Sequence, residues 1–203
     1  MAAEPAVLVA MALEAESAGR FEARGIPVLY TGVGKVNAAI ALTRELVRRA
    51  EAGRPLPLVA NFGTAGSATI APRTLVACHR FVDRDMDVGA LGFAPGTTPF
   101  DALPPLLEFA PHFRGLPEAT CGSGDSFATR PHGEVCELVD MEAYALAKAC
   151  RLAGADFACA KYVSDAADQD AARHWQQNVA GAAEAFVRLY DLLLNPPAGA
   201  SRA

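Results

Sequence analysis

Apolar runs alternate with helical patterns along the whole chain. Runs of consecutive apolar residues predict buried strands, and apolar residues that recur with helical spacing predict amphipathic helices. We predict strands over 6–12, 26–31, 57–62, 73–82, 136–140 and 157–163, and helices from about 13, over 36–52, over 141–153 and over 170–193. This alternation is typical of an α/β fold with a mostly parallel sheet covered on both faces.

The alternation continues almost to the end of the chain. We therefore predict a single three-layer α/β domain over residues 1–195, with a mixed, mostly parallel central sheet flanked by helices. The sequence Asn195-Pro196-Pro197 is expected to begin a frayed tail over 196–203.

Residues 92–117 interrupt the pattern. They contain six prolines with aromatic residues between them. Proline removes a backbone donor, breaks helices and is excluded from central strands. One interpretation is a functional loop, which rims or covers a site or lies in a subunit contact. The other is an ordinary surface loop, and the sequence favours neither.

Composition excludes several classes of protein. The chain is 52% hydrophobic and 20% charged, which is typical of a globular protein, and its net charge of −5 argues against a nucleic-acid partner. No apolar run is long enough for a membrane span, and we expect no signal peptide. The five cysteines form no C-x-x-C pair, which favours the reducing cytoplasm. The four histidines lack metal-ligand spacing, so we expect neither a metal nor a cofactor.

Polar residues follow most of the predicted strands directly. Because parallel strands end at the same edge of a sheet, and ligands bind outside that edge, residues far apart in sequence can line one pocket. The residues concerned are Glu14 after the first strand, Gly32, Gly34 and Lys35 after the second, Thr64 after the third, Asp140 and Glu142 after 136–139, and Ser164 and Asp165 after the last.

The residue types suggest a chemistry. Three acids, a glycine-rich turn and no basic cluster suit a neutral or weakly cationic ligand with hydroxyl groups. One carboxylate can accept hydrogen bonds from two neighbouring hydroxyls, and two further carboxyls suit cleavage through an oxocarbenium-like transition state. Each residue also has a plain structural explanation: Glu14, Glu142 and Asp165 could stabilise helix N-termini, and the glycines could form ordinary turns.

The order of the motifs resembles a known family. The motifs are Ala10-Met11-x-x-Glu14, Thr31-Gly32-Val33-Gly34-Lys35-Val36-Asn37-Ala38-Ala39, Asn61-Phe62-Gly63-Thr64-Ala65-Gly66, Ser123-Gly124-Asp125-Ser126-Phe127, Asp140-Met141-Glu142-Ala143 and Ser164-Asp165-x-Ala167-Asp168. Together they resemble the nucleoside phosphorylase superfamily, and most of all the 5′-methylthioadenosine/S-adenosylhomocysteine nucleosidases. The resemblance covers nearly the whole chain.

This resemblance implies a role for each matching residue. Asp165 matches the general acid that protonates the purine base, and Glu14 matches the residue that directs water. Glu142 matches the clamp on the ribose hydroxyls, with Met141 against the sugar. The other implied substrate-binding residues are Phe127 and the Ala128 backbone at the base, Trp175 near the 5′ substituent, and Thr64, Ala65, Gly66, Val33 and Ser164; Val88 matches a segment that reaches the neighbouring pocket of a homodimer. Trp175 is equally explained as a core aromatic of the last helix.

The choice between water and phosphate as nucleophile depends on cationic groups. Phosphate usually needs arginine or a nest of amides. The resemblance places an arginine before the glycine turn in phosphorylases, where this chain has Asn61, and the charge of Glu14 would repel phosphate. Both features favour hydrolysis of the N-glycosidic bond of a purine nucleoside.

Three other functions stay open. A phosphorylase would need Arg20 or a partner's arginine to complete a phosphate site. A futalosine-type nucleosidase would use the same residues, and a nucleoside-binding module would have lost turnover. Relative to the family, the hairpin before Thr31 is nearly absent, Asp140 stands where glutamate is common, and Lys161 replaces a frequent arginine. These departures put the identity of the substrate in doubt.

Overall fold

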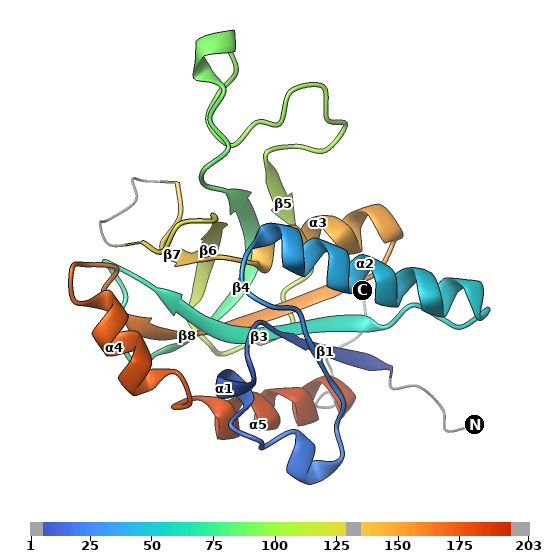
Figure 1. Cartoon of the computed structure of the whole chain (residues 1–203). Coiled ribbons are helices and arrows are strands. Elements are labelled where there is room, and N and C mark those ends of the chain that lie inside the picture. Colours follow the sequence, from blue (N-terminus) through green and yellow to red (C-terminus); the bar gives the residue numbers. More distant parts are fainter. Residues whose placement is uncertain (1–5, 129–134, 196–203) are drawn as a thin grey trace.

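The computed structural model describes residues 6–128 and 135–195, and Figure 1 shows the arrangement of the chain. The predicted tail over 196–203 lies outside the described residues. The elements, in chain order, are β1 (Val7–Met11), α1 (Glu14–Ser17), a 3₁₀ turn (Glu22–Arg24), β2 (Val28–Tyr30), α2 (Lys35–Glu51), β3 (Leu58–Gly66), β4 (Leu75–Asp83), a 3₁₀ turn (Gly89–Leu91), β5 (Leu106–Glu108), β6 (Glu118–Ser123), β7 (Leu138–Asp140), α3 (Ala143–Ala153), β8 (Phe157–Asp165), α4 (Ala171–Asn178) and α5 (Ala183–Leu194).

The strands form one mixed sheet that closes on itself. β2, β1, β3 and β8 are parallel in that order, and β4, β6 and β7 form a second parallel set. Antiparallel pairs join the two sets, β8 with β4 and β7 with β3. The prediction of a single α/β domain with a mixed sheet and flanking helices is confirmed. The closure of β3, β8, β4, β6 and β7 into a ring was not predicted.

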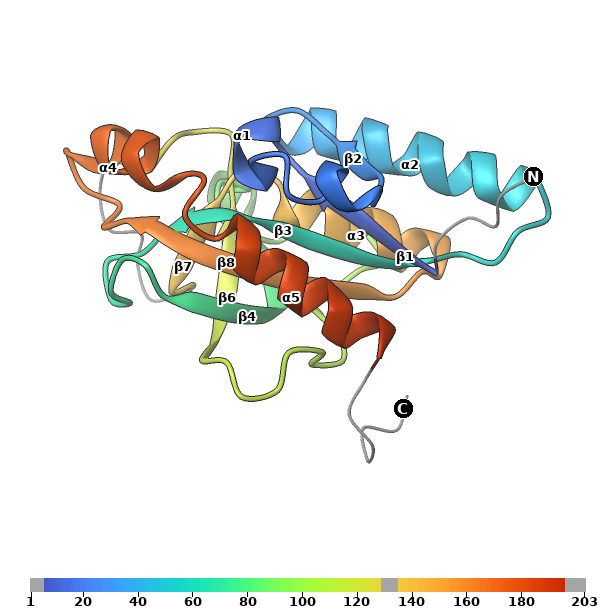
Figure 2. The same ribbon diagram turned by 90° about the horizontal axis from the view of Figure 1, so that it is seen from below.

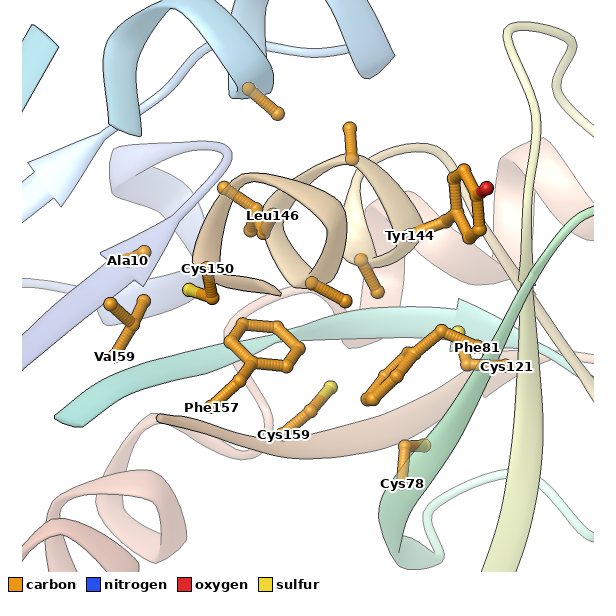
Figure 3. Packing of buried hydrophobic residues seen from close by; sticks show 14 of the residues in the cluster. Ala10, Val59, Cys78, Phe81, Cys121, Tyr144, Leu146, Cys150, Phe157 and Cys159 are labelled. Atoms are coloured by element: carbon orange, nitrogen blue, oxygen red, sulfur yellow. The ribbon is translucent and has the colours of Figure 1, made fainter. Parts of the chain in front are cut away.

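Helices cover the two faces of the sheet (Figure 2). On one face, α2 and α3 bury a core in which Phe81 and Phe157 meet edge to face at 5.1 Å between ring centroids, beneath Leu146 (Figure 3). On the other face, α5 brings Phe186 onto Phe62 with ring centroids 5.2 Å apart. Burial of these apolar side chains on both faces supplies the main driving force for the fold.

The last predicted helix is two helices. We predicted one helix over 170–193, whereas α4 ends at Asn178 and α5 begins at Ala183. A side chain at Gly181 would place its Cβ 2.9 Å from the hydroxyl of Tyr162, so the turn between the helices needs glycine to pack on β8. The Asn178 side chain donates to the carbonyl of Ser164 at 2.9 Å, which fixes the end of α4 against β8.

Two strands were missed in and after the proline-rich segment. β5 pairs with β4 alone and lies at the sheet edge, where proline-rich neighbours are tolerated. β6 has the sequence Glu-Ala-Thr-Cys-Gly-Ser, which lacks an apolar run, and yet it is buried between β4 and β7. Residues 92–105 of the segment belong to an arm, residues 84–105, which projects from the body at the top of Figure 1.

Neither a membrane span nor a metal cluster is found in the parts of the chain that the structure describes. None of the helices there is long and apolar enough to cross a bilayer. Within the same ranges, no three His, Cys, Asp or Glu side chains gather as metal ligands would.

Candidate active site

The polar residues meet where the two parallel sets of strands join. β7 runs antiparallel to β3, so the simple picture of one parallel edge does not hold for Asp140 and Glu142. Gly66 at the carboxyl end of β3 pairs with Val139 near the carboxyl end of β7. Because β7 is only three residues long, its last residue still lies beside the ends of β3 and β8.

Asp165 is a buried acid at the end of β8, with 3% of its surface exposed. Its Oδ2 accepts a hydrogen bond from the Ser164 hydroxyl at 2.7 Å, and its Oδ1 accepts one from the Ala167 amide at 2.9 Å. A Cβ at Gly66 would lie 2.7 Å from Oδ1, so glycine at this position allows the strand to pass close to the acid. The carboxyl group is thus held in one orientation.

Glu142 is the residue at which α3 begins, and it is almost fully buried. Its Oε1 accepts a hydrogen bond from the Gly34 amide at 2.9 Å, which joins the glycine turn to this acid across 108 residues of sequence. Burial raises the pKa of Glu142 to about 7, and the neighbouring charge of Asp140 adds to the effect. Glu142 therefore changes its protonation state near neutral pH.

Asp140 and Lys161 form a buried ion pair below the site. Lys161 Nζ lies 2.8 Å from Asp140 Oδ2, and their side chains are 2% and 1% exposed. Burial would raise the pKa of Asp140, but Lys161 holds it below its usual value. Asp140 also accepts hydrogen bonds from Ser123 and from the Ala143 amide. Asp140 and Lys161, the two residues that depart from the family pattern, thus form an ion pair with each other.

The first acid of the site is Glu16. Glu14 is exposed, whereas Glu16 is 4% exposed and points at the end of β3. Glu16 Oε1 accepts hydrogen bonds from the Thr64 amide at 2.8 Å and the Thr64 hydroxyl at 3.0 Å. Its Oε2 accepts from the amides of Ala12 and Leu13, each at 3.2 Å. The structure therefore brings Glu16, and not the predicted Glu14, to the site.

A spacing in the sequence makes Glu16 a candidate alongside Glu14. The pair Ala12-Leu13 followed three residues later by Glu16 repeats the spacing of Ala10-Met11 and Glu14, shifted by two residues. Glu14 and Glu16 both lie in the first turn of α1, where an acid has a favourable interaction with the helix dipole. Only the placement of α1 against β3 distinguishes the two acids.

Trp175 lies beside the same strand end. Its indole N–H donates to the Thr64 hydroxyl oxygen at 3.0 Å, and its side chain is half-buried on α4. The alternative prediction of a plain core aromatic does not describe this polar contact. Trp175 joins α4 to the residue that contacts Glu16.

A hollow of about 250 Å³, partly open to solvent, lies between the ends of β3, β7 and β8. Five of the predicted site residues line it, namely Gly66, Phe127, Ala128, Met141 and Asp165, and Phe127 is 45% exposed. Arg84, directly after β4, lines it as well and was not predicted, although it too follows a strand. The complete lining is Gly66, Arg84, Ser126, Phe127, Ala128, Val139, Asp140, Met141 and Asp165.

Arg84 holds the loop that carries Phe127. Its guanidinium group donates to the carbonyl of Ser126 and lies 3.4 Å from the carbonyl of Gly124. A Cβ at Gly124 would lie 2.7 Å from the guanidinium carbon, so glycine at this position lets the guanidinium group approach the loop closely. The loop between β6 and residue 128 is thus fixed by the start of the arm.

Lys35 joins the glycine turn to three aspartates. Its Nζ lies 2.7 Å from Asp83 and contacts Asp85, and its amide donates to Asp125 at 2.8 Å. Burial opposes the charge of Lys35, but the hydrogen bonds from Lys35 to Asp83 and Asp85 raise its pKa above the usual value. Lys35 follows Gly34, so these contacts also fix the amide that binds Glu142.

The remaining predicted residues differ in their surroundings. Ala65 and Ser164 are buried in β3 and β8, Val33 is exposed on the glycine turn, and Val88 is half-buried in the arm. The role of Val88 in a partner's pocket stays a prediction. Arg20 pairs with Glu184 at 3.7 Å on the surface, and the Asn61 amide donates to the Ala10 carbonyl at 3.1 Å within the core.

Comparison with known proteins agrees with this fold. The family model of the phosphorylase superfamily matches residues 16–194. A 5′-methylthioadenosine/S-adenosylhomocysteine nucleosidase of Geobacillus kaustophilus is 33% identical over 189 residues, which cover 83% of this chain and 78% of the relative. The nucleosidase of the same description from Marinomonas sp. is 30% identical over 189 residues, covering 82% of this chain and 79% of that protein.

Solved structures share the fold at lower identity. The futalosine hydrolase mutant of Helicobacter pylori superposes with a TM-score of 0.79 at 19% identity, covering 93% of this chain and 98% of the other. The 5′-methylthioadenosine/S-adenosylhomocysteine nucleosidase of the same organism, with butyl-thio-DADMe-Immucillin-A, also gives 0.79 at 19% identity, covering 93% and 97%.

The fold, the acids at the strand ends and the family match define a member of the phosphorylase superfamily. Within it, the chain belongs to the family of 5′-methylthioadenosine/S-adenosylhomocysteine nucleosidases. The prediction of an N-glycosyl hydrolase is confirmed by these relatives.

Proposed function

We propose that the chain hydrolyses the N-glycosidic bond of a purine nucleoside of the 5′-methylthioadenosine or S-adenosylhomocysteine type. The observation that carries this proposal is the convergence of three buried carboxyl groups, Glu16, Glu142 and Asp165, at one junction of strands. Relatives bearing this activity in their names, and solved relatives that hold nucleoside analogues, support a small nucleoside as the substrate.

Each acid has a separate task in this mechanism. Asp165 donates a proton to the base as the bond from the base to the anomeric carbon breaks. Positive charge develops on the sugar, and Glu16 orients water toward the anomeric carbon and accepts its proton. Glu142, in its ionised form, accepts hydrogen bonds from the two ribose hydroxyls, with Met141 against the sugar. The oxygen of water stays on the sugar, and the proton leaves with the base.

The base and the 5′ group have proposed places. Phe127 stacks on the base and the Ala128 backbone contacts its edge, which agrees with their position on the lining of the hollow. Trp175 borders the 5′ substituent. Thr64, Ala65, Gly66, Val33 and Ser164 complete the substrate-binding set proposed from the sequence.

The contacts of Glu16 favour water over phosphate. The amide and hydroxyl of Thr64 are donors of the kind that bind phosphate, and both donate to Glu16. The Glu16 carboxylate therefore occupies both donors of Thr64, and its negative charge would repel a phosphate at this turn. Arg20, the candidate cation of the phosphorylase alternative, is paired with Glu184 at the surface.

A futalosine-type substrate is the second candidate. The futalosine hydrolase and the methylthioadenosine nucleosidase of H. pylori superpose equally well on this chain, with a TM-score of 0.79 for each. The fold alone therefore does not separate the two substrates.

We also propose a homodimer. The outer side of α2 carries exposed apolar side chains with helical spacing, and an exposed stripe of this kind is typical of an interface. Its members are Val36, Ile40 and Val47 on α2, preceded by Val33 on the glycine turn. In such a dimer, the arm would carry Val88 toward the partner's pocket.

A nucleoside screen with a variant tests the proposal. Wild-type protein is incubated with methylthioadenosine, S-adenosylhomocysteine, futalosine, inosine and adenosine, and free base is measured by chromatography. We expect release from at least one of them, and a loss in kcat of at least about 10²-fold in Asp165→Asn with the fold retained. Tight calorimetric binding without any product would instead support the nucleoside-binding module, and near-normal turnover of the variant would remove Asp165 from the mechanism.

A further inference from the structure

Three groups in a row connect α4 to the acid that we assign to water. The Trp175 indole N–H lies 3.0 Å from the Thr64 hydroxyl oxygen, which in turn lies 3.0 Å from Glu16 Oε1. An indole nitrogen can only donate a hydrogen bond. The Thr64 oxygen must therefore accept from Trp175, and its single proton is directed to Glu16.

This direction matters for the orientation of Glu16. Four donors surround its carboxylate: the amide and hydroxyl of Thr64 on one oxygen, and the amides of Ala12 and Leu13 on the other. The three amides are fixed by the backbone. The Thr64 hydroxyl is the only one of the four that can rotate away, and Trp175 prevents this because it occupies the acceptor side of the same oxygen.

Helix α4 contacts two strands of the proposed site. These are β3, which carries the Glu16 partner Thr64, and β8, which carries Asp165. Trp175 reaches Thr64 on β3, and Asn178 on the same helix donates to the Ser164 carbonyl on β8 at 2.9 Å. Ser164 in turn donates to Asp165. The position of α4 is thus linked by hydrogen bonds to the surroundings of Glu16 and of Asp165.

We propose that Trp175 is a positioning residue, which orients Glu16 through the Thr64 hydroxyl and so links the seating of α4 to the attack of water. The inference rests on the proposed function for its catalytic consequence. It goes beyond an apolar contact with the 5′ substituent, which phenylalanine would provide equally well. The polar link needs the indole N–H.

A spectroscopic test does not require turnover. Trp175 is the only tryptophan of the chain, so protein labelled with nitrogen-15 gives one indole cross-peak. We expect the peak to shift in Thr64→Val and in Glu16→Gln, and to stay in place in Thr64→Ser, which keeps the hydroxyl. The matched control is Glu14→Gln, which removes an exposed charge two residues away. A peak unchanged by Thr64→Val overturns the link, whatever the activity.

The kinetic test separates positioning from substrate contact. Trp175→Phe keeps an aromatic ring and loses the N–H, and we expect kcat to fall about threefold to tenfold, as for one lost hydrogen bond, with KM nearly unchanged. Thr64→Val should lower kcat further, and adding Trp175→Phe to it should cost nothing more, because Trp175 acts only through Thr64. Gln176→Ala, an exposed change on the same helix, should match wild type.

The outcomes distinguish the inference from the proposed function. If the two losses multiply in the double variant, or if Trp175→Phe raises KM alone, the positioning role is wrong even though the nucleosidase activity stands. If no nucleoside is cleaved but the indole peak responds to Thr64→Val and Glu16→Gln, the link stands and the proposed reaction fails.

Discussion

At the scale of single residues, the proposed mechanism depends on which carboxyl group reaches the site. Glu14 and Glu16 lie two residues apart on the same short helix, but only Glu16 is buried against β3. The sequence resemblance alone aligned Glu14 with the water-directing role. The hydrogen bonds of Thr64 are the physical reason to assign the role to Glu16.

Matched variants of the two acids test this assignment. Glu16→Gln should lower kcat by about 10²-fold or more, because general base catalysis typically contributes about 10²–10⁴-fold. Glu14→Gln should stay near wild type, since its side chain is exposed. Steady-state kinetics on the substrate identified by the screen provide the measurement. The reverse ranking of the two variants would restore Glu14 to the role.

The protonation of Glu142 predicts a pH dependence. Its pKa is raised to about 7, mainly by burial, so the carboxyl group is largely protonated below that pH and ionised above it. The protonated form has fewer acceptor sites for the ribose hydroxyls. We expect KM for a ribonucleoside to rise about tenfold from about pH 8 to about pH 6.

The control for this pH dependence is Glu142→Gln, which has no titrating group. Its KM should be high and should vary little over the same range. The groups that face Glu142 are the Gly34 amide, Asp140, Lys161 and Glu16. A wild-type KM that stays constant across the range would show that Glu142 is not the titrating clamp.

At the scale of elements, long apolar strands and periodic helices could be predicted from the sequence. Elements that depend on close packing with distant residues could not. β1, α2 and α3 lie within a few residues of their predicted ranges. β6 could not be predicted because its pairing with β4 and β7 buries a sequence without an apolar run. The break between α4 and α5 depends on the contact of Gly181 with Tyr162, which no local pattern reveals.

The candidate site, like the fold, could be predicted only in part from the sequence. Asp165, Met141 and Phe127 were predicted from motif order, and the structure places all three around one hollow. Arg84 was missed although it follows a predicted strand, because an isolated arginine at the start of an irregular segment has no motif of its own. The pairing of Asp140 with Lys161 needed the approach of β7 and β8 in space.

The glycine turn before α2 gives a prediction about stability. Lys35→Met should lower the free energy of unfolding by about 1–3 kcal/mol, because it leaves the buried Asp83 without its charged partner. Urea denaturation measures the change. Arg173→Met is the matched control, since Arg173 and Asp170 form an exposed pair whose loss should cost less than about 0.5 kcal/mol. Equal stability of the two variants would contradict a structural role for Lys35.

At the scale of the whole molecule, the proposed homodimer would bring the arm of one protomer toward the site of its partner. Helix α2, which carries the exposed apolar stripe, lies on the face of the sheet opposite α5 (Figure 2). We expect Val36→Glu with Ile40→Glu to convert a dimer to a monomer, because two charges would be buried in the interface. Light scattering coupled to size exclusion measures the mass. Leu192→Glu on α5 is the control and should leave the mass unchanged.

The central claim is that three buried acids together hydrolyse the N-glycosidic bond of a nucleoside, with Glu16 directing water to the anomeric carbon. The most direct test is mass spectrometry of the sugar product formed in oxygen-18 water, with and without phosphate. The proposed hydrolysis predicts release of base in phosphate-free buffer and one labelled oxygen on the sugar in both conditions. A sugar phosphate without the label, formed only when phosphate is present, would contradict it.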